Sequence, residues 1–145
     1  MRFMVLAVCC VAASPASAAT TQEIANMSVR SWAAFECAAL ASSAGFRDEE
    51  DRLFKIAYDQ GTAFLQAYAD GKIADSEVTK YGSFNFYLRM HDGPSIDFKL
   101  GVIWAVAHQI AHEDISKNSD GSDTSYSEFT DRAILKFAHR NCRSL

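Results

Sequence analysis

Two cysteines, Cys37 and Cys142, remain in the chain once its first eighteen residues are set aside as a leader. Two cysteines allow a single intramolecular pairing, and we expect a Cys37–Cys142 disulfide. The bridge would close a loop of about a hundred residues, which the chain-entropy model values at about 4 to 5 kcal/mol. Two free thiols, or a disulfide between two copies of the chain, are the alternatives. A bridge of this kind requires the segments around both cysteines to lie side by side.

The leader is predicted from three features of residues 1–18. A charged residue, Arg2, precedes an apolar run over residues 3–13, and the small residues 16–18 form a cleavage site. We expect this signal peptide to be removed and residues 19–145 to form a single domain. No later segment has eighteen uninterrupted apolar residues, so we expect no membrane insertion after cleavage. The predicted location is the periplasm or the extracellular space, where disulfides persist.

The charge balance argues against nucleic acid as a partner. The chain has 14 Lys and Arg residues against 18 Asp and Glu residues, a net charge of −4. The charges are interspersed, whereas binding to phosphates requires clustered cations. An anionic membrane surface is disfavoured for the same reason.

The composition favours helices, because Pro94 is the one proline outside the leader. Capping residues, glycines and apolar spacing predict an all-α fold, a small bundle of about four principal helices. Residues 74–80 are expected to form a short helix or turn, and residues 117–125 a polar loop. The principal helices are expected at about 21–43, 48–71, 96–116 and 127–141.

The helix expected at 96–116 contains the most apolar stretch of the domain, Leu100–Ala107. A helix that is apolar on every side is usually the buried centre of a domain. We therefore expect this helix to be central, and the disulfide to join the first helix to the end of the last one.

The segment Phe84–Met90 is ambiguous in its secondary structure. Apolar and polar residues alternate along it, which is the period of a strand, while Phe84, Tyr87 and Leu88 also fit one face of a helix. A lone strand would have no partner in a helical chain, so a helix is favoured.

An aromatic stretch around this segment is the candidate for partner binding. Aromatic residues and Arg are enriched at the centres of protein interfaces. Core packing is the alternative role for the same side chains. The candidate residues are Tyr81, Phe84, Phe86, Tyr87, Arg89 and His91.

His108 and His112 lie four residues apart, so both imidazoles face one side of a helix and are weak candidates for metal ligands. The zinc-protease pattern needs a glutamate directly after the first histidine, and this chain has Gln109 there. No third ligand is identifiable from the sequence. We therefore predict no metal, no cofactor and no catalytic residue.

The expected function is non-catalytic binding of a protein partner by a small exported helical protein, such as an inhibitor, an immunity protein or a secretion accessory. Two alternatives stay open at this point. One is a hydrolase that uses a metal or a pair of carboxylates, for which Glu36 is a weak candidate. The other is a carrier of a small apolar ligand beside the most apolar helix.

Overall fold

A computed structural model describes residues 19–118 and 120–145, so the leader predicted for residues 1–18 lies outside the described residues. The described chain is all-α, as predicted, with six α-helices and a terminal 3-10 helix, η1. Outside these helices, the described residues contain only an isolated bridge between Lys117 and Asp123. The helices are α1 (Thr21–Ser43), α2 (Arg47–Ala69), α3 (Asp75–Tyr81), α4 (Phe84–Arg89), α5 (Ile96–Ser116), α6 (Tyr126–His139) and η1 (Cys142–Ser144).

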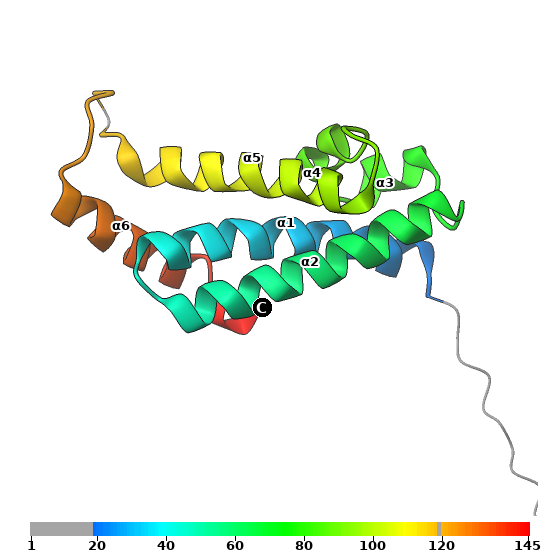
Figure 1. Cartoon of the computed structure of the whole chain (residues 1–145), viewed down its shortest axis with the longest axis horizontal. Helices are drawn as coiled ribbons and strands as arrows, with labels where there is room; N and C mark the ends of the chain where they lie inside the picture. Colours follow the sequence, from blue (N-terminus) through cyan, green and yellow to red (C-terminus); the bar gives the residue numbers. More distant parts are fainter. Residues whose placement is uncertain (1–18, 119) are drawn as a thin grey trace, which may run out of the picture.

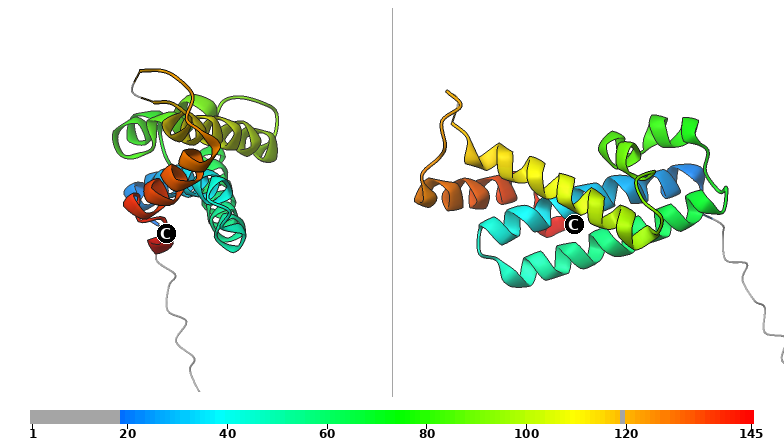
Figure 2. Two further views of the ribbon diagram at one scale, coloured as in Figure 1. Left: turned by 90° about the vertical axis from the view of Figure 1, so that its left-hand side faces the viewer. Right: turned by 45° about the horizontal axis from the view of Figure 1, so that its top comes forward.

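The helices pack around α1 in an elongated bundle. Helices α1 and α2 form an antiparallel hairpin, and α5 runs along α1 and also contacts α2 (Figure 1). The short helices α3 and α4 lie at the end of the bundle where α1 begins, whereas α6 lies at the other end (Figure 2). The two ends of the molecule are therefore built from different segments of the chain.

Local signals in the sequence explain where α1 begins and ends. The Thr20 side chain accepts a hydrogen bond from the backbone of Glu23, and the Glu23 carboxylate accepts one from the backbone of Thr20. This reciprocal capping satisfies two backbone N–H groups at the helix start. After α1, Gly45 adopts a left-handed φ of 77°, which favours glycine and turns the chain toward α2.

The prediction of a central helix at 96–116 is wrong, because α1 takes that position. Helix α5 buries one face only, and Gly101 and Ala105 on its other side are exposed. Helix α1 has neighbours on several sides, and its alanines let those neighbours approach closely. How deeply a helix is buried therefore depends on how many helices pack around it. The apolarity of its own sequence does not predict that number.

Three other expectations are confirmed. Residues 84–89 are helical, and the Ser83 side chain caps α4 by accepting a hydrogen bond from the backbone N–H of Phe86 at 3.3 Å. The polar segment between α5 and α6 is a loop, and the Cys37–Cys142 disulfide is present with the two Cα atoms 5.6 Å apart.

Across residues 19–118 and 120–145, every helix is too short or too polar to cross a bilayer.

Candidate functional site

The aromatic stretch proposed for partner binding divides into buried and exposed side chains. Phe86 is fully buried, and its ring makes an edge-to-face contact with Phe64 at a centroid distance of 5.3 Å. Met90 is buried as well. Phe86 thus belongs to the core, and with Met90 it anchors α4 to the bundle.

Phe84 and Leu88 lie on the outer side of the same helix. Their exposed fractions are 69% for Phe84 and 48% for Leu88. A spacing of four residues places both side chains on one helical face, which we call the α4 face. Tyr81, at the end of α3, is 37% exposed, and the ammonium of Lys80 lies 4.7 Å from its ring centroid.

Tyr87 and His91 belong to an aromatic cluster that joins α4 to α2. The His91 ring packs edge-to-face against Tyr87 at 5.5 Å and against Tyr68 at 5.9 Å. The Tyr68 hydroxyl donates a hydrogen bond to the Asp75 carboxylate at 2.6 Å, which raises the pKa of Tyr68 to about 12. The Tyr68 hydroxyl is thus a hydrogen-bond donor that ties α2 to α3.

The remaining partner-binding candidate, Arg89, is exposed and lies 3.9 Å from the Asp92 carboxylate.

Just before α4, the backbone N–H of Ser83 donates to the Ser28 side chain of α1 at 3.0 Å. Ser28 in turn donates to the Ala25 carbonyl at 2.7 Å. The α4 face is thus presented by a helix whose start is held to α1.

The two histidines on α5 form part of a row of rings. Trp104 contacts His108 at 5.3 Å, His108 stacks on His112 at 6.5 Å, and His112 contacts Phe129 of α6 at 5.1 Å. Among the described residues, no group of three or more His, Cys, Asp or Glu side chains is arranged to hold a metal ion. The observed contacts support a packing role, in which the imidazoles link the core tryptophan to α6.

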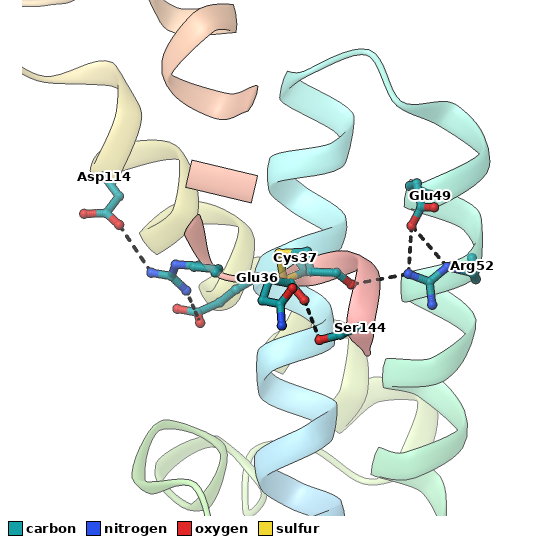
Figure 3. Close-up of a disulfide and its surroundings, with 9 residues drawn as sticks. Glu36, Cys37, Glu49, Arg52, Asp114 and Ser144 are labelled. Carbon is teal, nitrogen blue, oxygen red and sulfur yellow. Dashed lines mark hydrogen bonds and ion pairs between the residues drawn. A yellow bond between two sulfur atoms is a disulfide. The ribbon is translucent and has the colours of Figure 1, made fainter. Parts of the chain in front are cut away.

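Glu36, the weak carboxylate candidate, accepts a hydrogen bond from Arg140 next to the disulfide (Figure 3). The same guanidinium lies 3.3 Å from Asp114, and Lys136 lies 2.9 Å from the same carboxylate. The hydrogen bond from Lys136, together with the charge of Arg140, lowers the pKa of Asp114. These carboxylates therefore join segments of the bundle, since Lys136 of α6 and Arg140 directly after it bind their oxygens.

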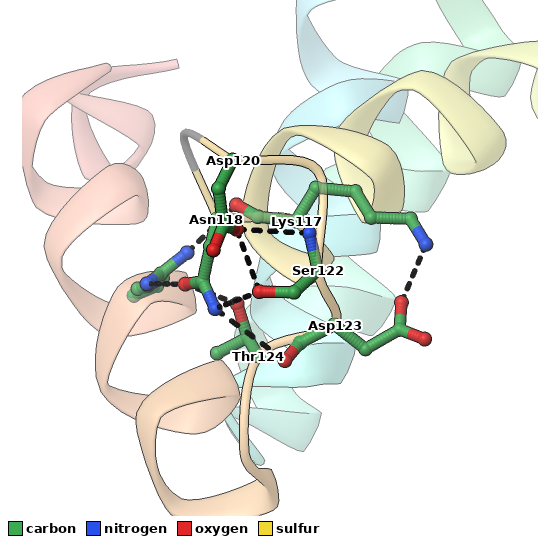
Figure 4. A network of polar contacts seen from close by, with 7 residues as sticks. Lys117, Asn118, Asp120, Ser122, Asp123 and Thr124 are labelled. Atoms are coloured by element: carbon green, nitrogen blue, oxygen red, sulfur yellow. Dashed lines mark hydrogen bonds and ion pairs between the residues drawn. The ribbon is translucent and has the colours of Figure 1, made fainter.

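The loop between α5 and α6 is held by its own polar groups (Figure 4). Asp120 accepts hydrogen bonds from the backbone and the hydroxyl of Ser122, at 2.9 and 2.6 Å. Arg132 of α6 donates to the Lys117 carbonyl at 2.8 Å and to the Asn118 side chain at 2.5 Å. Arg132 thus fastens this loop to the middle of α6.

A groove that the sequence reasoning missed lies beside the disulfide, between α6 and the turn that joins α1 to α2. Its volume is about 280 Å³, and its walls include Phe46, Ile134 and Phe137. Two segments that are far apart in sequence form it, the turn at Phe46 and residues 134–143, so periodicity could not reveal it. One signal was present: residues 132–145 contain four Lys and Arg residues and no Asp or Glu.

The apolar-ligand alternative gains nothing from the grooves that the structure shows, because segments other than Leu100–Ala107 line them.

Comparison with protein-family models, curated proteins and solved structures found no match. The geometry of this chain is therefore the basis for assigning a function.

Proposed function

We propose that this chain is an exported, non-catalytic protein that binds a protein partner through the α4 face. The observation that carries the proposal is the exposure of Phe84 and Leu88 on one side of a short helix whose opposite side is buried. Large apolar side chains on a firmly held helix lose little conformational freedom on binding, which favours association.

The supporting contacts make the α4 face rigid. Phe86 fixes the helix to the core, and the Ser83–Ser28 hydrogen bond fixes its start. The contact of the His91 ring with Tyr68 of α2 fixes the chain after its end. A preformed face of this kind is typical of anchor residues at interface centres.

Export is part of the same proposal. The leader predicted at residues 1–18 supports it, and so does the disulfide, since disulfides persist in oxidising compartments. The periplasm is the compartment we favour. Fractionation of cells that produce the full chain would test this, with the processed chain expected outside the cytoplasm.

Binding is tested by replacing Phe84 in the natural host with a photo-crosslinking phenylalanine analogue. We expect one specific crosslinked protein, and we expect it to disappear when Leu88→Asp is added. The matched control is Leu135→Asp on α6, because Leu135 has the same 69% exposure as Phe84. A crosslinked product that survives Leu88→Asp, or is lost equally with Leu135→Asp, would contradict the proposal.

A further inference from the structure

The groove beside the disulfide has an apolar interior. Phe46, from the turn between α1 and α2, and Phe137, from α6, meet edge-to-face at a centroid distance of 5.4 Å. Ile134 and Ala138, one turn apart on α6, also line the groove, and Ile134 is 38% exposed. Its volume of about 280 Å³ lies just below the range of small-molecule sites, which starts at about 300 Å³. The groove therefore suits one or two apolar side chains.

Polar groups and a cation occupy the C-terminal side of the same groove. Asn141 adopts a left-handed conformation with a φ of 54°, a region that asparagine tolerates better than most residues. This residue turns the chain sharply after α6 and brings Cys142 back to Cys37 on α1. Asn141 and Arg143 both line the groove.

Arg143 differs from the other cations of residues 132–145. Lys136 and Arg140 pair with acidic side chains of α5 and α1, and Arg132 bonds to the loop before α6. Arg143 makes no hydrogen bond or ion pair with any residue that the structure describes. Its guanidinium is therefore a cation beside an apolar groove, available to an anionic group of a ligand.

The surroundings direct such an anion to the α6 side of Arg143. The adjoining groove shares Phe46 and Arg143, and Arg47, Asp48 and Glu49 also line it. Its two carboxylates offset the charge of its two guanidinium groups, which makes it less favourable for an anion than the α6 side. The groove on the α6 side has no acidic residue in its lining. A charged group bound to Arg143 thus lies next to the apolar walls.

We propose that this groove is a second binding site, which takes a peptide segment carrying an apolar side chain next to a carboxylate. The apolar side chain lies against Phe46, Ile134 and Phe137, and the carboxylate accepts hydrogen bonds from Arg143. A guanidinium binds a carboxylate with two parallel hydrogen bonds, which adds specificity to the apolar contact. The site is preformed, because the disulfide holds Cys142 and Arg52 donates to the Cys142 carbonyl at 3.3 Å.

The test uses N-acetyl-L-phenylalanine as the probe and its uncharged amide as the comparison ligand. Each is titrated into the oxidised ¹⁵N-labelled chain without its leader, and backbone amide shifts are followed by NMR. We expect saturable shifts at Phe46 and over residues 134–143, with the carboxylate binding about three- to tenfold more tightly than the amide.

Two variants make the test specific. Arg143→Gln is expected to weaken the carboxylate to the level of the amide and to leave the affinity for the amide unchanged, whereas Arg47→Gln changes neither ligand. Ile134→Asn is expected to weaken both ligands. Equal affinities for the carboxylate and the amide, shifts outside the groove, or an Arg143→Gln variant that binds as wild type would overturn the proposal. Loss of the α4 face by Leu88→Asp leaves probe binding intact, so the two sites are tested separately.

Discussion

Arg140, directly after α6, pairs with Glu36 of α1, the residue next to Cys37, so an ion pair and a disulfide join the same two segments. The pair is partly shielded from water, since the side chains are 29% exposed for Arg140 and 12% exposed for Glu36. The end of the chain is therefore fastened to α1 both covalently and electrostatically.

Removing the disulfide should destabilise the domain without unfolding it outright. The double variant Cys37→Ala/Cys142→Ala frees a loop defined by a sequence separation of 105. The loss expected from loop-closure entropy is about 4 to 5 kcal/mol, and strain or residual structure reduces it in practice. Urea unfolding followed by circular dichroism measures the change. A variant with wild-type stability would show that the bridge contributes nothing to folding.

The Glu36–Arg140 pair should show measurable coupling. Each single variant, Glu36→Gln or Arg140→Gln, leaves a partly buried charge with fewer partners and should cost about 1.5 to 3 kcal/mol. The double variant should cost less than the sum of the two, because no unpaired charge remains. Additive losses in chemical denaturation would mean that the two side chains act independently.

Phe84 and Phe86 offer a matched pair of substitutions on one helix. Phe86→Ala removes a fully buried ring and should destabilise the protein by about 3 to 5 kcal/mol. Phe84→Ala removes an exposed ring and should change stability by less than about 0.5 kcal/mol. Thermal unfolding of both variants distinguishes them, and similar losses would contradict the division of the stretch into core and surface.

Two helical glycines should respond in opposite directions to alanine. A Cβ atom at Gly101 meets no atom within 4 Å, so Gly101→Ala should stabilise the protein by about 1 kcal/mol through helix propensity. A Cβ atom at Gly61 would lie 2.5 Å from Leu100 Cδ2 and 2.8 Å from the Ser31 hydroxyl. Overpacking at that point should outweigh the gain and cost about 1 to 3 kcal/mol. Chemical denaturation of the two variants measures whether each one raises or lowers the free energy of unfolding.

Acid should weaken the contribution of Asp114. Its pKa in the folded chain is lowered from the ordinary value of 3.8, so the ionised form stabilises the fold. That stabilisation is present above about pH 4 and is lost as the pH falls through the lowered pKa. The difference in unfolding free energy between wild type and Asp114→Asn should therefore shrink below pH 4. The control is Asp131→Asn, which changes an exposed residue of α6. A difference in unfolding free energy between wild type and Asp114→Asn that stays constant with pH would contradict this role of Asp114.

Local features of the fold and the disulfide were predictable from the sequence, whereas the packing of the helices was not. The bounds of α1 follow from Thr20 and Gly45, because capping and left-handed turns depend on nearby residues. The disulfide followed from counting cysteines.

The position of α5 could not be predicted, because the apolar residues of a helix do not reveal whether its neighbours cover one side or all sides. The division between Phe84 and Phe86 needed the direction of α4 in space. The groove at Arg143 needed the contact between Phe46 and residues 134–143, which are far apart in the sequence. The α4 face and the groove at Arg143 both depend on tertiary packing.

Cys37 and Cys142 also determine how the molecule responds to a protease. The exposed loop before α6 is the segment between them that protrudes farthest from the bundle, as Figure 1 shows. A single cut there would leave two fragments that still migrate together on a non-reducing gel and separate only after a reductant is added. The bridge therefore keeps both parts of the molecule covalently linked after one break in the backbone.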